Sequence, residues 1–114
     1  MIPFARSDRV GGLIQQVLSG ILKKDIGDPR LKTATITEVE VSRDLRLARI
    51  YFTTPGNKRK KEEDIKGFNS AHGFIKRALA KEVDLKYMPE IKFFYDDSLE
   101  YGTRIDELIK STKT

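Results

Sequence analysis

The residues of this chain with the clearest chemical potential are cations, and six of them stand in two groups. Arg43, Arg46 and Arg49 occur at every third position, and Lys76, Arg77 and Lys81 follow within one later segment. Lysine and arginine number 22 against 17 aspartates and glutamates, so the formal net charge is +5. Ammonium and guanidinium groups bind phosphate oxygens through charge-assisted hydrogen bonds. We therefore predict that these six side chains contact phosphates of folded RNA; the alternative is an ordinary solvated surface.

Catalytic chemistry is not indicated by the remaining polar residues. The sequence has no P-loop and no H-E-x-x-H motif. His72 is the only histidine and cysteine is absent, so a conventional zinc site cannot form. Asp96 and Asp97 would point to opposite faces of a strand, which is unsuited to shared acid–base work. We predict a protein that is not an enzyme and needs no cofactor or metal, with Tyr51 and Phe94 as the aromatics to test for base stacking.

The first element that must position these cations is an amphipathic helix. Ser7 is the predicted N-cap, and apolar residues recur at three- and four-residue spacing from Val10 to Leu22. Gly27 should close the helix, because Asp28-Pro29 disfavours its continuation.

A β-hairpin is predicted next. Residues 33–41 are rich in β-branched side chains, and their apolar positions change parity, which indicates a β-bulge near Thr37-Glu38. A turn at Ser42-Arg43-Asp44 leads to a strand at 47–53 with clean alternation. The short connection makes the two strands antiparallel.

A long amphipathic helix is predicted over 62–83, with an interruption at Ser70, Ala71, His72 and Gly73. Gly73 costs about 1 kcal/mol relative to alanine in a helix, so we place the bend there. We read His72 as a partly buried residue that sets the bend; the alternative is a group that contacts RNA. The acidic residues 62–64 should occupy the first turn, and the basic run 58–61 should lie on an exposed loop before it.

The final elements are a strand at 91–95 and a short helix. The strand–helix–strand order predicts that strands 47–53 and 91–95 pair in parallel. Asp97 and Glu100 have capping-box spacing before the helix, and the tail 110–114 should fray.

The whole predicts an α+β fold in one domain over residues 1–114. The order is α-β-β-α-kink-α-β plus a C-terminal helix, with a three-stranded sheet that carries helices on one face. No apolar run could span a membrane and no signal peptide is evident, so we expect a soluble, cytoplasmic protein. We also expect it to be a monomer.

The sequence also resembles the ribosome-binding factor A family. The matching residues are Arg9-Val10, Asp28-Pro29-Arg30-Leu31, Val39-Glu40-Val41-Ser42-Arg43-Asp44-Leu45, Ala48, Tyr51, Ala71-His72-Gly73, Pro89-Glu90-Ile91-Lys92-Phe93, Asp96, Ser98 and Gly102-Thr103-Arg104-Ile105. The resemblance implies a type II KH-like domain that binds the immature small (30S) ribosomal subunit and its 16S rRNA. It also implies help with late maturation, including processing of the rRNA 5′ end, without catalysis or cofactor.

One departure from ordinary KH domains bears on how RNA would be held. Their G-x-x-G loop brings backbone close to phosphates, but here Ser70 stands at the first glycine position and only Gly73 remains. Recognition should therefore depend more on basic side chains. Two other functions stay open at this point: a free-standing KH-like binder of single-stranded RNA, and an adaptor whose basic face docks an acidic protein.

Overall fold

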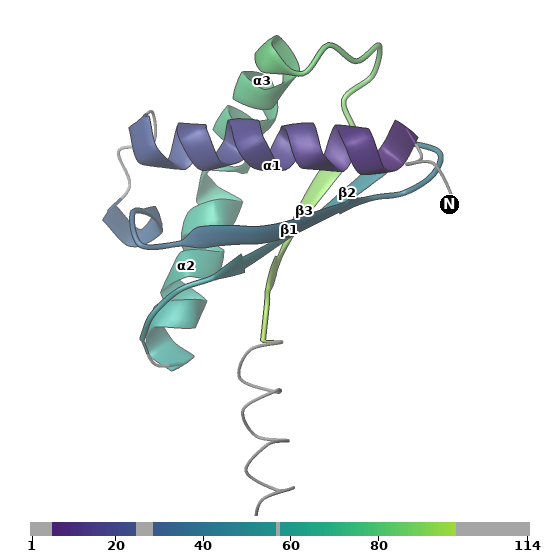
Figure 1. Cartoon of the computed structure of the whole chain (residues 1–114). Helices are drawn as coiled ribbons and strands as arrows, with labels where there is room; N and C mark the ends of the chain where they lie inside the picture. Colours follow the sequence, from purple (N-terminus) through teal and green to yellow (C-terminus); the bar gives the residue numbers. More distant parts are fainter. Residues whose placement is uncertain (1–5, 25–28, 57, 98–114) are drawn as a thin grey trace, which may run out of the picture.

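A computed structural model of the protein describes residues 6–24, 29–56 and 58–97. The elements run in the order α1 (Arg6–Lys24), η1 (Pro29–Leu31), β1 (Thr35–Val41), β2 (Leu47–Thr53), α2 (Lys58–Ser70), α3 (His72–Glu82) and β3 (Glu90–Tyr95) (Figure 1). Ser7 is a buried helical residue, and so it is not the N-cap that we predicted. The predicted closing residue Gly27 and the predicted C-terminal helix lie outside the described residues.

The three strands form one mixed sheet in the order β1-β2-β3. β1 pairs with β2 in antiparallel orientation, and the register shifts between Ile36 and Glu38, which confirms the predicted bulge. β2 pairs with β3 in parallel orientation, as the strand–helix–strand order predicted. β2 is therefore the central strand, and its side chains alternate between the two faces of the sheet.

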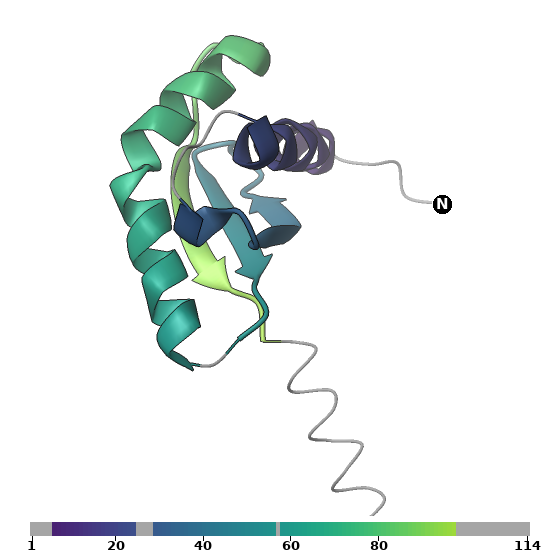
Figure 2. The ribbon, with the colours of Figure 1, turned by 90° about the vertical axis from the view of Figure 1, so that its left-hand side faces the viewer.

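The core lies on the side of the sheet that the helices cover. Ala48, Ile50 and Phe52 on β2 are all 0% exposed, whereas Arg49 between them is exposed. The apolar stripe of α1 and those of α2 and α3 join the same buried cluster. The Phe52 and Phe68 rings pack with centroids 4.6 Å apart, which joins β2 to α2. Figure 2 shows α2 and α3 as one bent column beside the strands, with α1 seen end-on.

The break between α2 and α3 is a single residue, Ala71, with φ −88° and ψ 1°. This break falls within the interruption predicted at residues 70–73, but Gly73, to which we attributed the bend, lies in the first turn of α3. Backbone hydrogen bonds from Ala71 N to Gly67 O (3.0 Å) and from Ile75 N to Ala71 O (2.9 Å) cross the break. The two helices are therefore held as one bent unit.

α2 begins earlier than its sequence pattern predicted, and this corrects the assignment of the basic run. Lys58–Lys61 is the first turn of α2 and not an exposed loop, so the acidic residues 62–64 fall in the second turn. Asp64 is fully buried, and Lys60 Nζ lies 2.5 Å from its Oδ1 and 2.9 Å from the Arg30 carbonyl oxygen. Burying a carboxylate requires such a partner, so this pair fixes the start of the helix.

α1 approaches the sheet closely at Gly11. A Cβ at Gly11 would lie 2.7 Å from the Val39 carbonyl oxygen, whereas a Cβ at Gly12 would meet nothing within 4 Å. Because the obstructing atom belongs to the backbone of β1, a side chain at this position would push helix and sheet apart.

We therefore predict opposite effects of two adjacent substitutions. Gly11→Ala should destabilise the protein by about 1–3 kcal/mol through overpacking. Gly12→Ala should stabilise it by up to about 1 kcal/mol, because alanine favours the helix and finds open space. Urea unfolding of the two variants measures both effects. Equal stability of the two variants would show that the α1–β1 contact is looser than described.

Candidate nucleic-acid interface

The predicted phosphate-binding cations fall at three separate places on the fold. Arg43 and Arg46 lie at the β1–β2 turn, and Arg49 lies on the open face of the sheet. The other three project from α3. The six therefore do not form one continuous patch, and each place has its own chemistry.

The β1–β2 turn is held by its own side chains. Ser42 Oγ donates to Asp44 Oδ1 at 2.6 Å, and the Arg46 backbone N–H donates to the same oxygen at 3.1 Å. These bonds, chiefly the one from Ser42, lower the pKa of Asp44. Leu45 has φ +61°, a left-handed conformation that costs a bulky residue about 1–2 kcal/mol. The turn therefore has a defined shape.

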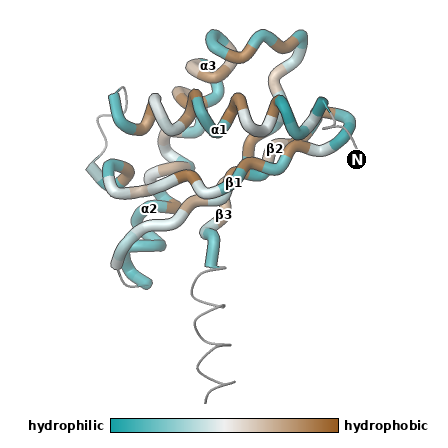
Figure 3. The backbone as a smooth tube through the Cα atoms, in the orientation of Figure 1, coloured by the Kyte–Doolittle hydropathy of each residue, from teal (hydrophilic) through white to brown (hydrophobic). Residues whose placement is uncertain are grey.

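A hollow of about 480 Å³ opens beside this turn, where the start of α1 and the connection from α3 to β3 meet it. The hollow is lined by Arg6, Asp44, Leu45, Arg46, Leu85, Lys86, Tyr87 and Met88. Figure 3 shows hydrophilic residues both at the start of α1 and at the turn beside it. Tyr87 is 77% exposed, and the sequence prediction did not single it out. The sequence signal that could have identified Tyr87 is a lysine next to a tyrosine in a short connection. Hydrophobic periodicity does not detect such a pair, because the connection is neither helix nor strand.

On α3, Lys76 is already engaged. Its Nζ lies 3.2 Å from Glu90 Oε2, and His72 Nε2 lies 3.5 Å from Glu90 Oε1 and 3.0 Å from the Ile91 carbonyl oxygen. These contacts tie the start of α3 to the start of β3. Lys76 is therefore the least available of the predicted cations, and His72 has the geometry of a residue that positions the helix.

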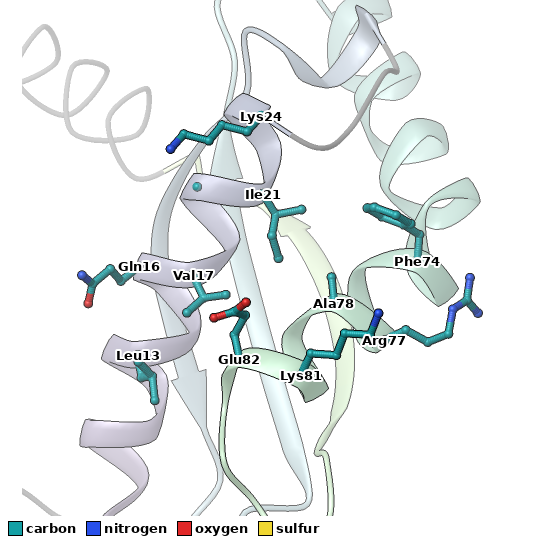
Figure 4. A pocket seen from close by; sticks show the side chains of 11 residues that line it. Leu13, Gln16, Val17, Ile21, Lys24, Phe74, Arg77, Ala78, Lys81 and Glu82 are labelled. Carbon is teal, nitrogen blue, oxygen red and sulfur yellow. The ribbon is translucent and has the colours of Figure 1, made fainter.

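Arg77 and Lys81 stand at the edge of a groove of about 790 Å³ between α1 and α3 (Figure 4). The floor is apolar, and Phe74 is 43% exposed on it. Lys24 lies on the α1 side of the groove, opposite the two α3 cations. Among the residues that the structure describes, neither Arg77 nor Lys81 has an ion pair, so both are free to meet an anion.

The open face of the sheet carries mixed charge. Arg49 stands opposite Glu40 on β1 and opposite Lys92 on β3. Tyr51 and Phe94 pack beside each other with ring centroids 5.7 Å apart, and burial, then the charge of Glu40, raises the pKa of Tyr51. The Tyr51 and Phe94 rings already pack against each other, and the Glu40 carboxylate lies beside Tyr51. This face therefore suits phosphate less well than the turn or the groove.

The basic run at the start of α2 is engaged within the fold. Lys60 is paired with Asp64, and the Lys61 ammonium lies 4.3 Å from the centre of the Tyr95 ring. Arg59 approaches Glu63 at 3.7 Å. Lys60 and Lys61 therefore serve the docking of α2, whereas Lys58 and Arg59 are exposed on its surface.

The described part of the chain offers neither a metal site nor a membrane span. No group of three or more histidine, cysteine, aspartate or glutamate side chains there could hold a metal ion. No helix in residues 6–24, 29–56 and 58–97 has the length and apolar character required to cross a membrane.

The fold and its exposed cations define a small α+β domain of the type II KH-like class, with a one-residue break in place of the glycine-rich loop. The chain belongs to the ribosome-binding factor A family, whose model matches residues 6–109. It is similar to ribosome-binding factor A of Desulfatibacillum aliphaticivorans, with 48% identity over 96% of this chain and 89% of the relative. For that of Desulfosudis oleivorans the identity is 49% over 100% of this chain and 88% of the relative.

Solved structures agree in fold. A Thermotoga maritima protein determined by NMR in solution gives a TM-score of 0.74 at 30% identity, over 88% of this chain and 95% of that chain. The crystal structure of Thermus thermophilus ribosome-binding factor A gives a TM-score of 0.69 at 20% identity, over 78% of this chain and 94% of that chain.

The charge on Asp44 generates a prediction about pH. Its pKa in the folded protein is lowered from the ordinary value of 3.8, so its contribution to stability is present above that value and is lost as the pH falls below it. Asp44→Asn should lower the urea midpoint at about pH 6, and the gap from the unsubstituted protein should narrow by about pH 3. A gap of constant size across this range would show that the carboxylate charge does not hold the turn.

Proposed function

We propose that this protein binds the immature small (30S) ribosomal subunit and its 16S rRNA, and that it assists late maturation, including processing of the rRNA 5′ end. In this role the protein acts by binding and catalyses no reaction. The observation that carries the proposal is the pair Arg77 and Lys81, exposed at the edge of the α1–α3 groove and without an ion pair among the described residues. Unpaired cations on a rigid helix can neutralise phosphates without first breaking a protein salt bridge.

Membership of the ribosome-binding factor A family supports this assignment. A homology model of the Thermus thermophilus member has been fitted into a cryo-EM map of a 30S complex, and it gives a TM-score of 0.66 to this chain at 20% identity. That chain is matched over 97% of its length, so the same fold is available for the same type of complex here. A folded subunit offers the dense phosphate surface that cations on several elements can meet at once.

The α3 cations give a direct test. Arg77→Ala combined with Lys81→Ala should weaken co-sedimentation with free small subunits, and should flatten the dependence of log affinity on log salt by about 0.7–0.9 for each lost phosphate contact. Lys66→Ala, which removes an exposed cation from α2, is the matched control and should change neither quantity. Lys76→Ala should have the smaller effect of the α3 cations, because Glu90 already holds it. An unchanged salt slope in the double variant would refute this placement of the contact.

The maturation role has a separate readout. Cells that lack the gene should accumulate 16S rRNA with an unprocessed 5′ end, and the intact chain should restore processing. If the protein bound a short unstructured RNA as tightly as intact subunits, the single-stranded binder would be the better description. Survival of its complexes after ribonuclease treatment would instead favour the protein adaptor.

A further inference from the structure

The hollow at the β1–β2 turn is built from three segments that are far apart in the sequence. Arg6 comes from the start of α1, Arg46 from the turn, and Lys86 and Tyr87 from the connection between α3 and β3. The Glu90 backbone N–H donates to the Arg46 carbonyl oxygen at 2.8 Å, which joins the connection to the turn. Figure 1 shows the start of α1 beside the β1–β2 turn. The backbone of Arg46 is thus fixed through its N–H and its carbonyl oxygen.

The charge in the hollow favours an anion. Arg6, Arg46 and Lys86 contribute three positive charges against the one carboxylate of Asp44. That carboxylate already accepts hydrogen bonds from Ser42 Oγ and from the Arg46 N–H, so it is committed to the turn. Clustered guanidinium and ammonium groups are the usual protein ligands of phosphate.

Tyr87 adds a second kind of contact beside the cations. Its side chain is 77% exposed, whereas Tyr51 and Tyr95 each pack against another aromatic ring. Lys86 Nζ lies 5.6 Å from the centre of the Tyr87 ring, and in the described part of the chain Tyr87 has no ring partner. An exposed ring next to phosphate ligands is the arrangement with which proteins stack an unpaired base.

We propose that this hollow is a binding site for one unpaired RNA nucleotide, whose phosphate is held by Arg6, Arg46 and Lys86 and whose base stacks on Tyr87. The proposal rests on the function proposed above and adds a site to it, distinct from the α1–α3 groove. Leu45, Leu85 and Met88 are partly buried and give the hollow an apolar floor beneath the base. Its volume of about 480 Å³ falls within the range of small-ligand sites.

The shape of the hollow is set before any RNA arrives. Leu45 is held in a left-handed conformation that a leucine rarely adopts, and its side chain lines the hollow. Strain of this kind persists where the surrounding bonds enforce it, and it is found at binding sites. The Ser42 and Asp44 hydrogen bonds supply that enforcement, so the backbone of Arg46 does not have to be ordered by the ligand.

The test measures fluorescence anisotropy of a short labelled oligouridine with the full chain. Tyr87→Ala should lower affinity about tenfold with an unchanged salt slope, because stacking is lost and no phosphate contact is. Tyr87→Phe should retain affinity, since it keeps the ring. Arg46→Ala should weaken binding and flatten the salt slope by about one contact. Lys66→Ala is the control for general charge, and thermal unfolding of Tyr87→Ala should match that of the unsubstituted protein.

Three results would overturn the site. The first is equal affinity of Tyr87→Ala and the unsubstituted protein for the oligouridine. The second is that Tyr87→Ala loses as much affinity for an abasic strand, which has no base to stack, as it loses for the oligouridine. The third is displacement of the strand by an equal concentration of free uridine monophosphate, which would make the hollow a mononucleotide site. If the protein binds small subunits but Tyr87→Ala does not change the affinity for the oligouridine, the site fails and the proposed function stands. If Tyr87→Ala lowers the affinity for the oligouridine, but neither the unsubstituted protein nor any variant binds small subunits, the proposed function fails and the site stands.

Discussion

The pleat of β2 is the constraint on which the rest of the structure depends. One side of this strand is fully buried beneath the helices, and the other carries Arg49 and Tyr51 toward solvent. A slip of one residue would exchange the two faces, placing a guanidinium in the core. The antiparallel partner on one edge and the parallel partner on the other both fix this register. The register of β2 therefore determines which side chains are exposed and available for binding.

Much of the fold follows from local patterns that the sequence carries openly. The bounds of β2 were predicted correctly, because its alternation is uninterrupted, and the parity change in β1 located the bulge. The start of α2 was missed, since Lys58–Lys61 reads as a solvated run unless Asp64 is known to be buried beneath Lys60. The interruption at residues 70–73 was predicted correctly, but it was attributed to Gly73 because glycine is a poor helix former, whereas the break lies at Ala71.

The site was less predictable, for a physical reason. Counting cations treats every lysine as available, whereas availability depends on distances between segments that only the fold brings together. Lys76 meets a carboxylate from β3, and Lys61 lies over the ring of Tyr95. Within residues 6–24, 29–56 and 58–97, Arg77 and Lys81 have no ion pair, and no periodicity distinguishes them from Lys76. The hollow with Tyr87 likewise exists only once three distant segments meet.

Glu90 carries a consequence for how the molecule would hold a large ligand. Its carboxylate forms an ion pair with Lys76 and lies near His72 on α3. Its backbone N–H donates a hydrogen bond to the Arg46 carbonyl oxygen in the hairpin turn. The two cationic surfaces are thus connected through one residue. Once one surface has engaged, the other is presented at a high effective concentration, so two individually weak contacts act together as a bidentate clamp.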